Sequence, residues 1–232
     1  MLRHFATFGL GLTFVGAAAF GAVKDTPPSV SVAVRNTFDV WAVPLGLDPG
    51  FAVLNKFQLS GTLAGDRLGL AGWSAHAQIF RFDGQSLSSR SGDIQIADNL
   101  AAVPVTRLFE AWIARQWGKG NRSIALRAGL IDLNSQFDAI DPASLFINSS
   151  HGIAPHLSQS GRDGPLIYPV SAPGTTLTIV PSPRWTFRVG VFDGVAGNQD
   201  RPRAFSSQRF GRNDGVLTIA QADLQLSKAK QG

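Results

Sequence analysis

The sequence contains no cysteine, few charged residues and no long apolar run beyond its first 22 residues. Without cysteine, the chain forms no disulfide, no Cys-ligated zinc or iron–sulfur site and no cysteine nucleophile. Only 16% of the residues are charged and 44% are hydrophobic, including 16 phenylalanines, which excludes a disordered chain. The length of 232 residues suits one domain, and no stretch after residue 22 is long and apolar enough for a transmembrane helix.

The sequence also lacks the clustered positive charge that nucleic-acid-binding proteins present. Its 21 Lys and Arg residues exceed its 16 Asp and Glu residues, which gives a net charge of +5. These cations are scattered along the chain with no run of four or more, whereas a nucleic-acid footprint gathers on one face or one helix. We therefore expect no nucleic-acid partner.

No familiar catalytic motif is present, since the chain has no G-x-S-x-G, no H-E-x-x-H and no Walker loop. His151 and His156 form a pair without a third ligand nearby in the sequence, so we expect no metal site. Asp138 and Asp141 are a carboxylate pair of the kind that hydrolyses glycosides, yet nothing in their sequence surroundings marks a raised pKa. We expect that the chain is not an enzyme and needs no cofactor.

Residues 1–22 have the layout of a secretory signal peptide. A single cation, Arg3, precedes an apolar stretch from Phe5 to Phe20, and small residues follow up to Ala22. A short membrane anchor is the alternative, although the apolar run is marginal for a bilayer span of about 20 residues. We expect cleavage near residues 19–22, which leaves a domain of residues 23–232 in the periplasm, in the outer membrane or outside the cell.

Beyond residue 22 the hydrophobic pattern has a period of two, which indicates β-strands. Turn sequences such as Asp83-Gly84 separate the alternating runs. The alternation slips around Asn36, and residues 107–117 could also form an amphipathic helix, although their neighbours favour a strand. The expected strands are residues 29–40, 51–62, 73–82, 107–117, 122–131, 175–180, 184–192 and 215–226.

Two segments do not alternate and are expected to be long loops. Residues 148–174 are rich in Ser, Gly, Pro and His, and residues 196–213 are polar and rich in Arg. Long loops on a sheet scaffold often carry function, but they can also be simple solvated connections.

Strands with one apolar and one polar face fit two architectures. In a soluble β-sandwich the apolar faces share a core, whereas in an outer-membrane barrel they face lipid and the polar faces line a lumen. The signal peptide and the charged residues on the polar faces favour the barrel. Aromatic residues near strand ends favour it too, because such barrels carry aromatic girdles at both membrane interfaces. The girdle candidates are Trp73, Phe82, Phe109, Trp117, Trp185 and Phe192.

Several stretches of the sequence resemble those of one family, both in their residues and in their order along the chain. They are GWSAHAQIFRFDGQSLS (72–88), GDIQIADNLAA (92–102), RLFEAWIARQW (107–117), LRAGLIDLNSQFD (126–138), SLFINSSHGIAP (144–155), WTFRVGVFDG (185–194) and NDGVLTIAQADLQL (213–226). The chain in this way resembles the carbohydrate-selective porins of the OprB type, from the outer membranes of Gram-negative bacteria. The fold class that follows is all-β, an antiparallel transmembrane β-barrel of the outer-membrane porin type.

The resemblance implies a 16-stranded barrel, whose constricted water-filled pore passes glucose-type mono- and oligosaccharides by passive diffusion. It implies carbohydrate solutes, outer-membrane lipid and a homotrimer as partners. The chain departs from the family in holding about half of the expected strands, and Gln221 stands where the family suggests an acidic residue. Residues 23–232 are therefore expected to be a partial barrel, part of a longer reading frame; a decayed gene product and assembly with another chain are the alternatives.

Two other functions stay open from the sequence. A secreted, soluble carbohydrate-binding β-sandwich would bury the aromatic face in a core and bind sugar through loops. An outer-membrane barrel that is structural would conduct nothing. Fractionation separates the first from a porin, and single-channel conductance with sugar block separates the second.

A sugar pore needs a constriction lined with hydrogen-bonding groups and no catalyst. The alternation directs Glu110 and Arg127 into the lumen from neighbouring strands, where they could also form a structural salt bridge. Trp112 lies on the polar face, where lipid does not explain it. The expected pore-lining residues are Glu110, Arg127, Arg188, Trp112, His76, Gln78, Asp132 and Asn134.

Other polar residues have a weaker claim to the pore. Asp132, Asn134 and Phe137 stand where a strand runs into a loop, so turn capping could also explain them. Arg81 falls on the lipid-facing side near the end of its strand and is expected to snorkel to the interface. The loop residues that reach sugar only if the loop folds inward are Asn148, His151 and His156.

Overall fold

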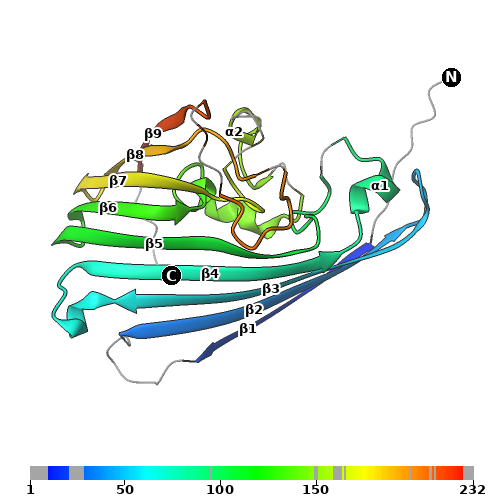
Figure 1. The fold of residues 1–232 in the computed structure, drawn as a ribbon, viewed down its shortest axis with the longest axis horizontal. Helices are drawn as coiled ribbons and strands as arrows, with labels where there is room; N and C mark the ends of the chain where they lie inside the picture. The colour runs from blue at the N-terminus through cyan, green and yellow to red at the C-terminus, as the bar shows by residue number, and fades with distance from the viewer. Residues whose placement is uncertain are drawn as a thin grey trace.

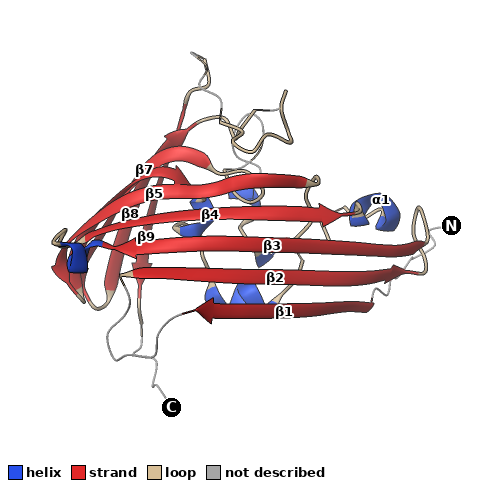
Figure 2. Cartoon of the chain, turned by 60° about the horizontal axis from the view of Figure 1, so that its bottom comes forward, coloured by secondary structure: helices blue, strands red, loops and turns tan. Residues whose placement is uncertain are grey.

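The computed structural model describes residues 10–20, 29–94, 96–148, 151–158, 164, 166–198, 200–208, 211 and 213–226. Its strands form one nine-stranded sheet in which each strand pairs with the next along the chain, always antiparallel. Figure 1 shows this sheet curving around the long loops, and Figure 2 shows several helical turns behind the strands, with α1 beside the end of β4.

The strands and helices follow one another in a simple up-and-down order. The strands are β1 (Leu10–Phe20), β2 (Val30–Val43), β3 (Gly50–Ala64), β4 (Trp73–Gly84), β5 (Val105–Lys119), β6 (Arg122–Ile131), β7 (Ala172–Ser182), β8 (Trp185–Asp193) and β9 (Val216–Leu224). The helical turns are η1 (Gly65–Leu68), α1 (Leu87–Ser91), η2 (Leu133–Ser135), η3 (Asp141–Leu145) and α2 (Pro155–Ser158).

The antiparallel all-β fold expected from the sequence is confirmed. The eight predicted strands correspond to β2–β9, and residues 107–117 lie within a strand rather than a helix. β1 falls inside the segment that the sequence marks as a signal peptide, and it pairs with β2 from Leu10 opposite Ala42 to Phe20 opposite Val32. Cleavage near residues 19–22 on export stays a prediction.

The pairing of β2 with β3 runs without interruption from Val30 opposite Leu63 to Val43 opposite Gly50. The predicted slip around Asn36 is therefore wrong. Asn36 keeps its place in the alternation and is exposed, and its side-chain oxygen accepts a hydrogen bond from the Asn55 amide at 3.0 Å. Asn36 interrupts the hydrophobic pattern because it is a polar residue in an otherwise apolar row. The hydrogen bond to Asn55 gives its side chain a partner there.

A β-bulge in β5 changes which of its side chains face the loops. Gln78 pairs with Glu110 but Ile79 pairs with Leu108, so Phe109 is the extra residue. Arg107 and Phe109 are consequently buried on the loop-covered face of the sheet, hereafter the inner face. Strict alternation over residues 107–117 predicts that Phe109 shares a face with Ile113. This prediction is wrong, because the extra residue inverts the alternation between them.

The opposite, outer face of the sheet is apolar and exposed. The alternation is regular in β8, where Phe187 and Val189 are exposed while Gly190 and Phe192 are buried on the inner face. No helix of the described segments is long and apolar enough to cross a membrane. The exposed apolar side chains of the outer face include Val53, Phe57, Leu59, Ile113, Trp117, Ile124, Leu126, Phe187, Val189 and Val191.

At the end of the sheet where the long loops join it, the inner face is apolar and packs against those loops. One cluster joins Phe80, Phe82 and Phe109 of the strands to Leu87 and Tyr168 of the loops. A second cluster joins strand residues to loop residues in the same way, and its members include Ile131, Leu133, Phe137, Ile153, Leu166 and Phe192. The loops thus fill the concave side of the sheet at this end.

Half of the expected aromatic girdle is therefore placed wrongly. Phe82, Phe109 and Phe192 are at most 5% exposed and point inward, because the returning loops offer them apolar partners. Trp73, Trp117 and Trp185 are 38–44% exposed and stand where β4 and β8 begin and β5 ends. These three strand ends meet the short turns, so the tryptophans line one rim of the outer face.

Arg107 fastens two long loops to the strand wall. Its side chain is 2% exposed, and its Nη1 donates to the Pro169 carbonyl at 2.8 Å while Nη2 donates to the Pro202 carbonyl. Beside the bulge, the Leu108 amide donates to the Phe205 carbonyl at 2.8 Å. The loop before β7 and the loop before β9 are therefore held by one buried guanidinium.

Replacing Arg107 with Met should destabilise the fold. The substitution keeps an unbranched side chain but leaves two carbonyls without a donor, at about 1–3 kcal/mol each. We expect a lower unfolding midpoint in detergent and faster proteolytic cleavage in residues 196–208. The control is Arg67→Met, at an exposed position in η1. Equal midpoints for the two variants would contradict the role of Arg107.

Candidate functional site: a polar wall on the inner face

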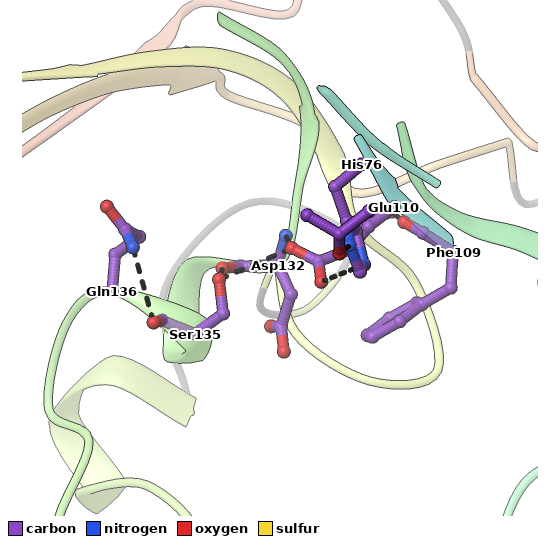
Figure 3. Close-up of polar contacts among 8 residues, drawn as sticks. His76, Phe109, Glu110, Asp132, Ser135 and Gln136 are labelled. Atoms are coloured by element: carbon purple, nitrogen blue, oxygen red, sulfur yellow. Dashed lines mark hydrogen bonds and ion pairs between the residues drawn. The ribbon is translucent and has the colours of Figure 1, made fainter. Parts of the chain in front are cut away.

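Beyond the loop-filled end, the inner face becomes polar. Alternate residues of β4–β8 direct the side chains of His76, Glu110, Trp112, Arg127 and Arg188 to this face, hereafter the polar wall. Figure 3 shows His76 and Glu110 at its boundary with the loop that follows β6. The loop reaches the polar wall at Glu110, which accepts hydrogen bonds from Asp132 and Ser135.

Trp112 connects the polar wall across three strands. The His76 ring on β4 stacks against it at a centroid distance of 5.1 Å and an interplanar angle of 19°. From β6, the Arg127 guanidinium carbon lies 3.8 Å from the Trp112 ring centroid. The indole therefore orients a cation by a cation–π contact, which is worth about 0.5–2 kcal/mol depending on solvent exposure.

Gly129 makes room for this arrangement. It is paired with Trp112, and its φ of +141° lies in a region that residues with a Cβ rarely adopt. A Cβ at this position would lie 2.3 Å from the Ala111 carbonyl oxygen and 2.6 Å from the Trp112 Cα. Only glycine allows the β5 backbone to approach this closely.

Glu110 anchors the loop to the polar wall instead of pairing with Arg127. Its Oε1 accepts hydrogen bonds from the Asp132 amide at 3.2 Å and the Ser135 hydroxyl at 3.3 Å. His76 Nε2 lies 4.0 Å from Oε2 (Figure 3). The register places Arg127 opposite Ala114, which separates it from Glu110, and no direct ion pair joins these two described side chains.

Asp132 lies next to Glu110 at the start of the loop. Burial, reinforced by the Glu110 charge, raises the pKa of Asp132 from 3.8 to about 7. The hydrogen bond from the Asn134 backbone N–H and the positive charge of Lys56 act in the opposite direction. The Asp132 carboxylate accepts a hydrogen bond from the Asn134 amide at 3.1 Å and caps η2. This carboxyl therefore titrates near neutral pH.

Asn134 and Gln78 occupy different positions. The Asn134 side-chain amide donates to the carbonyls of Phe137 at 3.2 Å and Asp138 at 3.3 Å, which braces the turn. Gln78 lies half-buried on the inner face, directly opposite Glu110. Contact of Asp132, Asn134 or Gln78 with a solute stays a prediction.

Arg188 is held by an ion pair. It contacts the Asp223 carboxylate of β9, and the Gln221 amide donates to the same carboxylate at 2.7 Å. The Gln221 side-chain oxygen accepts a hydrogen bond from the Asp138 backbone N–H at 2.8 Å, which connects the loop to β9. An acidic residue at position 221 would lack the amide that donates to Asp223. Arg188, Gln221 and Asp223 border a hollow of about 310 Å³.

A larger hollow of about 1080 Å³ lies along the inner face. It extends from the short-turn ends of the strands, near Gly72 and Gly120, to the level of Arg127 and Arg188. Its inner end is bordered by Gln136 from the loop and by Thr176, whose hydroxyl contacts the Gln136 side-chain oxygen at 3.3 Å. A loop therefore borders the hollow at the level of the two arginines.

Sequence reasoning missed three polar residues of this region. Lys56 faces inward from β3 and lies 3.7 Å from the Tyr168 ring centroid, and the alternation with Gln58 and Ser60 could have revealed it. Gln136 and Thr176 come together only because the loop folds back across β7. The loop residues that the sequence suggested differ in exposure. Phe137 is buried, whereas His151 stacks on Phe146 and both residues are exposed.

The family model for the carbohydrate-selective porin, OprB family, matches residues 48–232. The chain belongs to this family. Among solved structures it is similar to Pseudomonas putida OprB in a structure at high pH, with a TM-score of 0.68 and 16% sequence identity. The match covers 84% of this chain and 47% of the OprB chain, so this chain spans about half of that protein's length. No curated protein matches the chain.

The family and the structural match agree with the architecture. They confirm a porin-type antiparallel sheet, and the family consists of transport channels rather than enzymes. At 16% identity the structural match concerns the fold alone. Residue roles in this chain therefore depend on its own geometry.

Gly129→Ala should disturb the polar wall. The added Cβ meets backbone atoms and forces a strained φ, at a cost of about 1–3 kcal/mol or more. We expect a lower unfolding midpoint and a shifted tryptophan emission, because Trp112 must move. Gly61→Ala is the matched control, since there a Cβ would meet only the Ser31 carbonyl oxygen at 4.0 Å. A normal midpoint and emission for Gly129→Ala would refute the packing argument.

Asp132 should make stability depend on pH between about 4 and 7. The pKa of Asp132 is higher in the folded than in the unfolded state. Its contribution to the free energy of unfolding is therefore full below the unfolded-state pKa and is lost as pH rises through about 7. The total change in the free energy of unfolding is on the order of 4 kcal/mol. Unfolding midpoints measured from pH 4 to 8 should fall less steeply for Asp132→Asn, which retains an acceptor for the Asn134 amide. If the unfolding midpoints of Asp132→Asn and of the unmodified protein change with pH to the same extent, Asp132 is not the titrating group.

Proposed function

We propose that this chain forms part of the wall of an outer-membrane channel through which sugars diffuse passively. The observation that carries the proposal is the hollow along the polar wall, which a loop borders where Arg127 and Arg188 lie. Guanidinium groups offer several directed N–H donors, and sugar hydroxyls are acceptors that match them. Membership of a carbohydrate-selective porin family supports the same solute class.

Arg127 and Arg188 are the residues that we propose meet the solute. A different interaction holds each side chain: a cation–π contact with Trp112 for Arg127, and an ion pair with Asp223 for Arg188. Trp112 is then a positioning residue, because its ring already contacts Arg127 and His76. Glu110, His76, Gln78, Asp132 and Asn134 complete the proposed pore wall or hold the loop that narrows it.

The exposed outer face supports a membrane location. In the described segments no second sheet covers its apolar side chains, as a soluble sandwich requires. Lipid is the solvent that suits such a face in a porin fold. We accordingly propose export by a signal peptide, outer-membrane insertion, glucose-type mono- and oligosaccharides as solutes, and a homotrimer as the assembly.

Liposome swelling tests the proposal. A complete barrel that includes this chain, reconstituted in phospholipid vesicles, should admit glucose, and Arg127→Gln should change the glucose rate by about fivefold, the equivalent of ~1 kcal/mol. Trp112→Leu should act in the same direction, because Arg127 loses the ring that orients it. Arg67→Gln, in the exposed turn η1, is the control. A protein that is recovered without detergent, or that inserts but passes no sugar, would overturn the proposed function.

A further inference from the structure

A cation lies between two tryptophans on the outer face, at the short-turn end of the sheet. The guanidinium carbon of Arg115 is 5.3 Å from the ring centroid of Trp73 and 5.2 Å from that of Trp117. Trp73 is directly opposite Arg115 in the β4–β5 pairing, and Trp117 follows two residues later in β5. All three side chains therefore project from the same face of the sheet.

The surroundings of Arg115 make a charge there unexpected. Its neighbours on the same face, Ile113 and Ile124, are exposed apolar residues. The Nε atom of Arg115 is buried without a hydrogen-bond partner, and no oxygen of the described residues accepts a bond from its guanidinium. A guanidinium carries five N–H donors, so most of its hydrogen-bonding capacity is left for a molecule outside the chain.

Arg81 provides a comparison on the same face. It lies at the opposite, long-loop end of β4, where it donates to the Asp83 carboxylate and to the Thr106 hydroxyl. Arg81 thus has an anion supplied by the chain, whereas Arg115 has two aromatic rings and no anion. The two rings flank the Arg115 guanidinium, and its N–H donors stay available to an anion from outside the chain.

The rim around Arg115 carries further positive charge. Lys119 and Arg122 are exposed and directly opposite each other in the last pair of the β5–β6 ladder. Asp66, in the adjoining turn η1, already accepts a hydrogen bond from the Gly72 amide at 2.7 Å. This rim therefore complements a negatively charged partner.

We propose that Trp73, Arg115 and Trp117 bind the phosphate of a phospholipid headgroup. The inference rests on the proposed function, since in a porin the short turns face the periplasm and this rim lies at the inner leaflet of the outer membrane. Tryptophan rings belong at the headgroup level of a bilayer, and the planar fork of arginine matches phosphate oxygens. The acyl chains would then lie along Ile113 and its apolar neighbours.

Native mass spectrometry with phosphatidylglycerol tests this site. The protein in detergent should retain bound phosphatidylglycerol, and Arg115→Gln should retain at least about fivefold less, a change equivalent to ~1 kcal/mol. Arg81→Gln, the matched control on the same face, should retain as much as the unmodified protein. Arg115→Lys keeps the charge without the planar fork and should be intermediate. Equal retention by Arg115→Gln and the unmodified protein would overturn the proposal.

Two further arms identify the source of any failure. If inorganic phosphate at millimolar concentration displaces the lipid, the site binds free phosphate and the headgroup assignment is wrong. Flotation with phosphatidylglycerol–phosphatidylethanolamine vesicles reports membrane insertion separately. If the unmodified protein does not float, the proposed function fails; if it floats and Arg115→Gln binds lipid normally, only this inference fails.

Discussion

Arg107 and the β-bulge beside it attach two long loops to the strand wall, and the division of the inner face follows from that attachment. Where the loops pack, the strands need apolar side chains, so Phe80, Phe82 and Phe109 point inward. Beyond these clusters a hollow borders the strands, and polar side chains face it. One buried guanidinium that satisfies two loop carbonyls thus holds the loops that border the polar wall.

The polar wall holds its arginines by two different physical interactions. Arg127 lies on the face of an indole and Arg188 contacts a carboxylate, and both border the hollow along the wall. Either contact restricts a flexible side chain without using all of its donors. A channel that passes neutral solutes needs this combination, since an oriented donor selects by hydrogen-bond geometry while weak binding allows release.

The outer face differs between its two ends. At the long-loop end Arg81 is neutralised by Asp83, whereas at the short-turn end Arg115 lies between Trp73 and Trp117 without an anion from the chain. Between them the face is apolar. This asymmetry suits a bilayer whose two surfaces differ, as the proposed outer-membrane location requires.

The sequence by itself determined the antiparallel sheet and the inward direction of Glu110, Trp112, Arg127 and Arg188, because a period of two assigns side chains to faces without knowledge of distant contacts. Tertiary structure alone decided the bulge at Phe109, which depends on pairing with β4. It also decided the inward turn of Phe82 and Phe192, since apolar residues face either lipid or a core, and only the returning loops supply that core. Glu110 and Arg127 share a face, but the register separates them, and register depends on the partner strand rather than on local pattern.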